Sequence, residues 1–139
     1  MERLRGRIAS ALACYDSQDS PGVALLANLH GREVFRHAVT RMAEAVEISL
    51  RANGLSTNDL DWVVPHQANI RIMDSMAKKL GLKHEQIIVT VDSQANTSAA
   101  TIPLALAIAD GEGRLKQGQL ISLTAMGGGF TWGSVLLRW

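Results

Sequence analysis

The chain has 139 residues, of which 47% are hydrophobic, so it is long enough to form one globular domain with a real core. Its 14 Lys and Arg residues nearly balance 13 Asp and Glu residues, and a net charge of +1 gives no strong field to attract nucleic acid or an anionic membrane. The sequence has a single cysteine and no zinc-like His/Cys spacing, which fits a reducing compartment. No apolar run approaches the length of about 20 residues that a membrane span needs, and the N-terminus has no signal-peptide core. We therefore expect a soluble, cytoplasmic protein.

The first predicted elements are a short helix, a loop and a longer helix. Apolar residues recur at helical spacing from Arg3 to Cys14, and the turn-forming residues of YDSQDSPG then break the pattern. The apolar run 23–29 has no readable period, so it is either a strand or a buried connection. An apolar stripe predicts a helix from about Glu33 to Ala52, ended by Gly54. The stripe consists of Phe35, Val39, Met42 and Val46.

The middle of the chain alternates strands with helices. DWVVP, residues 61–65, is rich in β-branched and aromatic residues and predicts a strand that its proline ends. Asn69 is a candidate N-cap for a helix that runs to Leu80. We expect a second strand at 87–91, IIVTV, and then a helix that runs to about Ala109. This last helix is apolar on every side, which is typical of a helix covered all round by protein.

The end of the chain predicts a hairpin. QLISLTAM at 119–126 and TWGSVLLRW at 131–139 are the two strands, and the glycines 127–129 join them. Helices alternating with four short strands indicate an α/β fold with a mixed sheet. The all-apolar helix needs a second layer of protein, and this chain is too short to supply one. We therefore expect the chain to be part of something larger or to pair with another copy.

Three polar features follow apolar elements at the ends of predicted strands. They are His66, Asn96 and the glycines 127–129. Ligands collect at strand ends in α/β sheets, so the three are candidates for one pocket. A neutral histidine and an asparagine amide can each donate a hydrogen bond, and two donors aimed at one oxygen would stabilise an enolate or oxyanion. Glycines let backbone N–H groups approach a ligand closely. Together these features indicate carbonyl chemistry.

Each feature also has a purely structural interpretation. A histidine at a strand end can be a hydrogen-bonded structural residue, and Asn69 and Asn96 both precede helices that they can cap. The glycines can be only a tight turn between strands. Cys14 is followed by an acidic loop that would not lower its pKa, so an inert thiol is favoured over a nucleophile.

Three stretches together carry a resemblance to a known family. HQANIRI, then NTSAATIPLAL, then MGGGFTWGSVLLRW resemble the C-terminal half of β-ketoacyl-acyl-carrier-protein synthase III. The resemblance extends upstream through DLDWVVPHQAN and REVFRHAV. We therefore expect residues 29–139 to form the C-terminal domain of such an enzyme, whereas residues 1–28 match poorly and form an N-terminal remainder. The family resembles the thiolases, with two similar halves that enclose a central pair of helices, one of which would be the all-apolar helix.

The resemblance implies an acyltransferase that starts fatty acid synthesis and needs no cofactor. A cysteine takes the acyl group from acyl-coenzyme A, and the carbanion formed when malonyl-carrier protein loses carbon dioxide attacks the acyl-enzyme. His66 and Asn96 match the two residues that hydrogen-bond the malonyl thioester oxygen, and Gly128 matches the glycine that binds the oxyanion of the tetrahedral intermediate. The nucleophilic cysteine lies in the N-terminal half, so we expect this chain alone to be inactive.

The resemblance also implies partners. They are acyl carrier protein, the N-terminal half of the same enzyme and a second copy, because half of a stacked fold exposes an apolar face that favours self-association, as in a homodimer. The residues that match the carrier-protein and coenzyme A contacts lie in two helices and the loop before the second. They are Phe35, Arg36, Gln67, Ala68, Asn69, Ile70, Arg71 and Lys78.

The sequence departs from the family pattern at two positions beside the site. Ala95 stands where a glycine usually precedes the asparagine, and Met126 replaces an aromatic before the glycines. Neither change removes a donor. Two other interpretations stay open: a non-catalytic module that docks a carrier protein or subunit, and a related thiolase-like ketosynthase of secondary metabolism.

Overall fold

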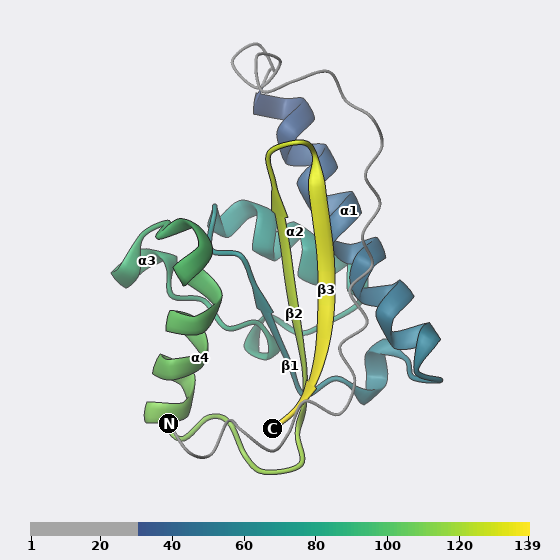
Figure 1. The fold of residues 1–139 in the computed structure, drawn as a ribbon, viewed down its shortest axis with the longest axis vertical. Helices are drawn as coiled ribbons and strands as arrows, with labels where there is room; N and C mark the ends of the chain where they lie inside the picture. The colour runs from purple at the N-terminus through teal and green to yellow at the C-terminus, as the bar shows by residue number, and fades with distance from the viewer. Residues whose placement is uncertain (1–30) are drawn as a thin grey trace.

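The computed structural model describes residues 31–139, and these form a three-stranded sheet with helices on both faces (Figure 1). The helix expected at residues 3–14, the apolar run 23–29 and Cys14 lie outside the described residues. One core cluster joins the sheet to α1 and α2, and a second joins its opposite face to α4. The expected α/β fold with a mixed sheet is confirmed.

The strands alternate their side chains between the two core clusters. β1 (Trp62–Pro65) pairs in parallel with β2 (Leu120–Gly127), which pairs antiparallel with β3 (Thr131–Arg138). Val63 packs into the cluster of α1 and α2, whereas Val64 packs into the cluster of α4. Because successive side chains of a strand point to opposite faces, both faces of this sheet are covered.

The helices on the first face match the sequence prediction closely. α1 spans Gly31–Ala52, and α2 spans Ile70–Leu80. Asn69 is the N-cap of α2, where its side chain accepts a hydrogen bond from the Arg71 N–H, and Gly81 ends the helix with a left-handed φ of 69°. Short 3₁₀ turns, η3 (Thr57–Asp59) and η4 (His84–Gln86), follow α1 and α2.

The fourth strand expected at residues 87–91 does not form. The segment makes one isolated parallel bridge, between Val63 and Ile87, and the Ile88 N–H donates to the Val63 carbonyl at 2.9 Å. It then turns into α3 (Val91–Gln94), followed by η5 (Ser98–Ala100). Ile87, Ile88 and Thr90 of the segment are therefore buried without belonging to a strand ladder.

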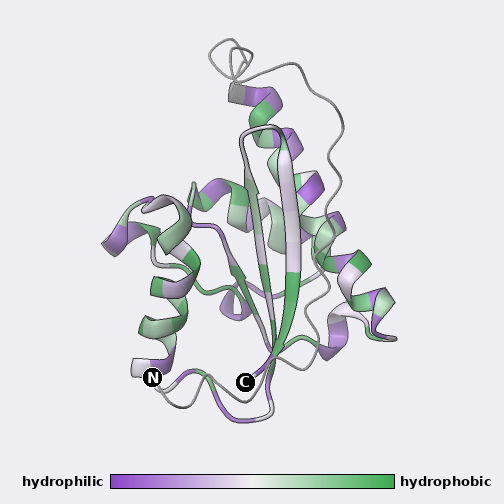
Figure 2. Ribbon diagram, viewed as in Figure 1, coloured by the Kyte–Doolittle hydropathy of each residue, from purple (hydrophilic) through white to green (hydrophobic). Residues whose placement is uncertain are grey.

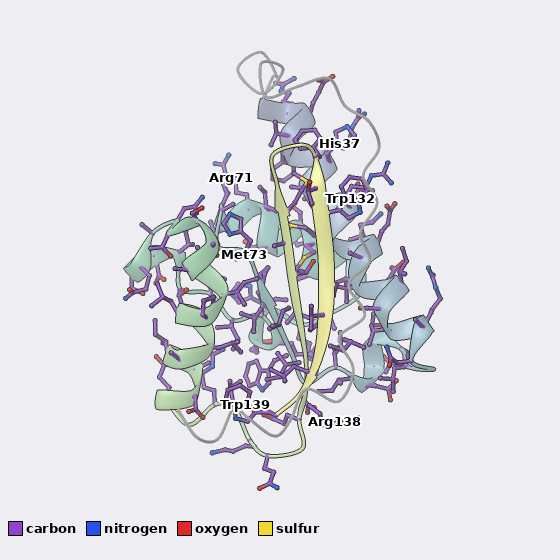
Figure 3. The ribbon with its side chains drawn as sticks, viewed as in Figure 1. His37, Arg71, Met73, Trp132, Arg138 and Trp139 are labelled. Atoms are coloured by element: carbon purple, nitrogen blue, oxygen red, sulfur yellow. The ribbon has the colours of Figure 1, made fainter. Side chains whose placement is uncertain are left out.

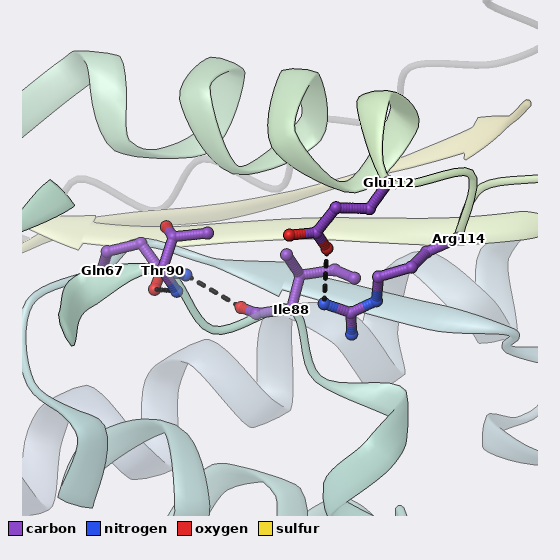
Figure 4. A network of polar contacts seen from close by, with 5 residues as sticks. All are labelled: Gln67, Ile88, Thr90, Glu112 and Arg114. Atoms are coloured by element: carbon purple, nitrogen blue, oxygen red, sulfur yellow. Dashed lines mark hydrogen bonds and ion pairs between the residues drawn. The ribbon is translucent and has the colours of Figure 1, made fainter. Parts of the chain in front are cut away.

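The side chain of Gln67 explains why the ladder stops there. Gln67 is 0% exposed, and its amide nitrogen donates to the Pro65 carbonyl at 2.9 Å and to the Ile88 carbonyl at 3.0 Å. Its amide oxygen accepts from the backbone N–H groups of Thr90 and Val91 at 2.8 and 3.1 Å. Figure 4 shows the contacts of Gln67 with Ile88 and Thr90. One side chain thus takes the place of a neighbouring strand and fixes residues 88–91 to the end of β1.

The all-apolar helix is covered on one side only. α4 spans Thr101–Gly111, and its buried residues Thr101, Ala105 and Ala109 form one line along the helix. Pro103 and Ala107 are exposed on the other side, and Figure 2 shows that most of the helix is apolar or neutral in hydropathy. Within residues 31–139 there is no second layer of protein over this helix, as expected for a chain too short to supply one. No helix in this part of the chain is long and apolar enough to cross a membrane.

Replacing Gln67 by leucine should lower the free energy of unfolding strongly. The variant leaves the N–H groups of Thr90 and Val91 and two carbonyls buried without their partner, and each such loss costs about 1–3 kcal/mol. We expect a total loss of at least about 3 kcal/mol in urea denaturation. The same change at the exposed Gln117 is the control, with an effect within about 0.5 kcal/mol. Equal stability of the two variants would contradict this account of Gln67.

Candidate active site at one end of the sheet

His66 stands directly beyond the carboxyl end of β1. Its backbone N–H donates to the Thr124 carbonyl at 2.8 Å, which continues the parallel pairing by one residue past Pro65. The ring is half-buried, and its Nδ1 atom lies 2.7 Å from the Thr101 hydroxyl oxygen. Burial lowers the pKa of His66 below the ordinary value of 6.5, because desolvation disfavours the charged ring. The neutral form is thus favoured at neutral pH.

Asn96 lies in the loop between α3 and η5, and its side chain is exposed. Its Oδ1 atom accepts a hydrogen bond from the Ser98 N–H at 3.0 Å. This bond orients the carboxamide, because an amide oxygen that is held by a donor leaves the NH₂ group on the other side. The structural and functional interpretations of Asn96 are therefore compatible: the oxygen braces the loop while the two N–H donors remain available. Asn96 does not cap α4, whose N-cap is Ala100.

A short chain of hydrogen bonds joins the two candidate donors. His66 Nδ1 contacts Thr101 Oγ1, which lies 2.9 Å from the Ser98 carbonyl oxygen, and the Ser98 N–H holds Asn96. His66 and Asn96 are thus on the same edge of the fold and are connected through the first residue of α4. Thr101 was not predicted from the sequence as a site residue. Its only signal was a hydroxyl at the start of an otherwise apolar helix.

The glycine turn between β2 and β3 borders an apolar pocket beside His66. The pocket has a volume of about 200 Å³ and is lined by His66, Gly127 and Gly128 together with apolar side chains of α1 and α2. Phe130 stacks on His37 of α1 with ring centroids 5.5 Å apart, which fixes the turn against the helix. Asn96 is not among the lining residues. The described residues thus bring His66 and Gly128 into one pocket, whereas Asn96 does not line it.

The loop before Asn96 holds an unfavourable backbone conformation. Ala95 has φ 57° and ψ −168°, a region that side chains rarely adopt and that costs on the order of 1–3 kcal/mol. Ser98, two residues after Asn96, also has φ 57°. The conformation expected of a glycine is therefore kept although alanine occupies the position. The other departure, Met126, lines the pocket.

The residues expected to contact a carrier protein lie on the surface, with one exception. Arg36 is exposed on the first turns of α1, where Phe35 is half-buried, and Arg71 and Lys78 are exposed two turns apart on α2. Arg71 is labelled in Figure 3. Ala68, Asn69 and Ile70 are also exposed. Gln67 is the exception: its side chain is fully buried and all its polar groups have internal partners, so it cannot reach a docked protein in this conformation. We correct its role to that of a structural link.

The fold and the site define a mixed α/β unit with hydrogen-bond donors at one sheet edge and one apolar helix open on its outer side. Comparison with known proteins identifies the family to which this unit belongs. A family model described as 3-oxoacyl-[acyl-carrier-protein (ACP)] synthase III C terminal matches residues 50–139, more than half of the chain. The chain belongs to this family. No group of His, Cys, Asp or Glu residues in positions 31–139 could hold a metal ion.

Two curated relatives illustrate the match. The chain is 57% identical over 120 residues to the β-ketoacyl-[acyl-carrier-protein] synthase III of Rhizobium rhizogenes, covering 86% of this chain and 37% of the relative. It is 59% identical over 111 residues to the enzyme of the same name from Rhizobium meliloti, covering 80% of this chain and 34% of the relative. The chain thus spans about a third of the length of the curated relatives it matches.

Solved structures agree with the expected thiolase-like half. The 3-oxoacyl-[acyl-carrier-protein] synthase III of Aquifex aeolicus matches with a TM-score of 0.78 and 47% identity over 80% of this chain and 36% of its own. The enzyme of Pseudomonas aeruginosa gives a TM-score of 0.81 and 39% identity over 91% and 43% of the two chains. OleA of Xanthomonas campestris, at 19% identity and a TM-score of 0.76 over 91% and 37%, shares the fold alone.

Titration should find that His66 has a pKa below 6.5 in the folded chain and a value near 6.5 when the same chain is unfolded in urea. Because the folded state then binds fewer protons, the stability contributed by the neutral ring is present above about pH 6.5 and is lost as the pH falls through the folded pKa. Ring proton shifts followed by NMR give both values. A folded pKa at or above the unfolded one would refute the role of burial.

Proposed function

We propose that this chain is the C-terminal catalytic half of a 3-oxoacyl-acyl-carrier-protein synthase III and that it condenses acyl groups only when an N-terminal half is present. The observation that carries the proposal is the hydrogen-bonded path from His66 through Thr101 and Ser98 to Asn96. It leaves a neutral ring and an amide NH₂ as donors at one edge of the sheet. Neutral donors suit a negative oxygen that develops during a reaction.

In the proposed reaction, an acyl group moves from coenzyme A to a cysteine of the N-terminal half, with release of the coenzyme A thiol. Malonyl-carrier protein then loses carbon dioxide, and the electrons of that bond form an enolate at the thioester. His66 and Asn96 donate hydrogen bonds to the enolate oxygen. The enolate carbon attacks the acyl-cysteine carbonyl, whose oxyanion accepts from the Gly128 N–H. Collapse of that intermediate releases the cysteine and the 3-oxoacyl product.

The open surfaces support a missing half. Residues 92–100, which include Asn96, are all exposed, and α4 presents apolar residues such as Pro103 and Ala107 to solvent. An apolar surface beside functional residues is typical of an interface. We assign this surface to the N-terminal half of the same enzyme and propose that, without that half, a second copy of the chain covers it. The absence of a membrane-spanning helix among residues 31–139 suits the cytoplasm as the proposed location.

We further propose that acyl carrier protein docks over the start of α1 and along α2. Arg36, Arg71 and Lys78 are exposed, and within residues 31–139 none of them forms an ion pair. Unpaired cations near an apolar pocket suit an acidic partner that delivers a thioester arm, since complementary charge steers association. Phe35 and the exposed residues 68–70 lie in the same two regions of the chain.

The direct test supplies this chain with the N-terminal part of the Rhizobium rhizogenes relative and measures product from acyl-coenzyme A and malonyl-carrier protein. We expect no product from either piece alone and turnover from the mixture. Asn96→Asp should lower the turnover number by about 10²–10³, because a carboxylate keeps the bond to the Ser98 N–H but donates nothing and repels the enolate.

The matched control is Asn58→Asp, the same change at an exposed position in η3, which should leave turnover unchanged. Product from the isolated chain would refute the incomplete-enzyme proposal. So would a mixture that assembles but never turns over, and an Asn96→Asp mixture as active as the wild type would refute the donor role.

Charge reversal tests the carrier-protein surface separately. Arg71→Glu and Lys78→Glu together should raise the Kd for carrier protein at least about tenfold, because each reversal replaces an attraction by a repulsion worth about 1 kcal/mol. Arg51→Glu, an exposed arginine in the last turn of α1, is the control and should change the Kd less than about twofold. Titration calorimetry at two salt concentrations measures both. If Arg51→Glu raised the Kd as much as the combined Arg71→Glu and Lys78→Glu variant, the proposed surface would be contradicted.

A further inference from the structure

The turn that carries Gly128 has little of its own to hold it in one conformation. Residues 127–129 are three consecutive glycines, and all of them are exposed. Glycine has the largest backbone freedom of any residue and no side chain to pack. The pairing of β2 with β3 ends at Gly127 and Thr131, and within residues 31–139 no further hydrogen bond fixes Gly128 or Gly129. The position of the Gly128 N–H must therefore be set by contacts from outside the turn.

Two ring contacts from α1 reach this end of the hairpin. The His37 ring stacks on Phe130, with the centroids 5.5 Å apart and the ring planes inclined by 26°. Aromatic pairs attract one another in offset arrangements with centroids about 4.5–7 Å apart. The Arg41 guanidinium lies over the ring of Trp132, with its Cζ atom 5.1 Å from the centroid. That distance is inside the limit of about 6 Å for a cation–π contact.

The two contacts are aligned along the boundary between α1 and the hairpin. His37 and Arg41 are four residues apart, so they lie on the same face of the helix. Phe130 and Trp132 are two residues apart where β3 begins, so their side chains leave the hairpin on the same side. Figure 3 shows His37 and Trp132 where the start of α1 runs beside the hairpin. The end of the hairpin is thus held to the helix at two successive points.

The helix itself is fixed to the sheet by buried contacts. The Thr124 hydroxyl of β2 donates to the Met42 carbonyl at 3.3 Å, and the Ser49 hydroxyl donates to the Ser134 hydroxyl of β3 at 3.2 Å. Met42 is 3% exposed and belongs to the core cluster under the helix. Because these contacts hold α1 in place, the glycine turn takes its position from the helix.

We propose that His37 is a positioning residue whose ring holds Phe130 and thereby keeps the Gly128 N–H at the edge of the apolar pocket. Arg41 supports the same turn through Trp132. Phe130 also lines the pocket, so a ring that left His37 would displace a wall of the pocket together with the donor. The use of Gly128 on an oxyanion rests on the proposed function. The order of the turn does not, because it is a property of the chain without substrate or partner.

The first test measures the order of the turn in the 139-residue chain by ¹⁵N relaxation. We expect an order parameter of about 0.85 for the Gly128 amide in the wild type, as in rigid backbone, and a value below about 0.6 in His37→Ala. His37→Phe keeps an aromatic ring and should restore the wild-type value. His84→Ala, the same change at an exposed histidine of η4, is the control and should leave the turn unchanged.

The second test uses the mixture of halves and separates positioning from docking, because His37 directly follows Arg36 of the proposed carrier-protein surface. His37→Ala should lower kcat about threefold to tenfold, which is the effect of losing one aromatic contact. The KM for malonyl-carrier protein should change less than about twofold, because an oxyanion donor acts only after the substrate has bound. His37→Phe should recover the wild-type kcat.

A mobile Gly128 amide in the wild type would overturn the proposal, and so would a turn in His37→Ala that is as ordered as in the wild type. A raised KM with an unchanged kcat would make His37 a docking contact instead. If His37→Ala does not fold, Phe130→Leu removes the other ring and should loosen the turn in the same way. A mixture of halves that never turns over would refute the proposed function, whereas the relaxation data would still decide whether His37 holds the turn.

Discussion

The parallel register between β1 and β2 is the constraint on which the site depends. Pro65 lies opposite Thr124, and the His66 N–H extends the pairing by one more hydrogen bond of 2.8 Å to the Thr124 carbonyl. This register places the ring beside the glycine turn that ends β2. A slip of one residue would exchange Val63 and Val64 between the two cores, so burial on both faces of the sheet holds the register and, with it, the position of His66.

Once the register is set, side chains rather than further strands organise the site. Gln67 fastens the segment 88–91 to the end of β1, and that segment leads directly into the loop that carries Asn96. Thr101 ties the ring of His66 to the start of α4. Both contacts are made by side chains: Gln67 follows His66 directly in the sequence, and Thr101 is the first residue of α4. The resulting half-site is held by these internal hydrogen bonds, and within residues 31–139 it is exposed on the side where no protein covers α4.

Much of this arrangement could be predicted from the sequence because it is encoded locally. A proline closes β1 just before His66, Asn69 caps α2 through its own side chain, and the glycines mark the β2–β3 turn. The need for a second layer also followed from the local pattern, since a helix that is apolar all round must be covered on both sides and a chain this short cannot supply both layers.

What the sequence did not reveal depends on contacts between distant residues. The segment IIVTV has strand-forming residues, but the Gln67 amide takes the N–H groups of Thr90 and Val91 that a ladder would use. Motif resemblance grouped Gln67 with exposed neighbours because resemblance carries no information about burial. The role of Thr101 follows only from a contact across 35 positions of sequence.

A crystal structure of the assembled halves with a non-decarboxylating malonyl thioester analogue would test the central claim most directly. The account predicts that His66 Nε2 and Asn96 Nδ2 both lie within about 2.7–3.2 Å of the same thioester oxygen, with Nδ1 still on Thr101. An analogue whose oxygen contacts only one of the two donors, or a ring turned away from Thr101, would contradict it.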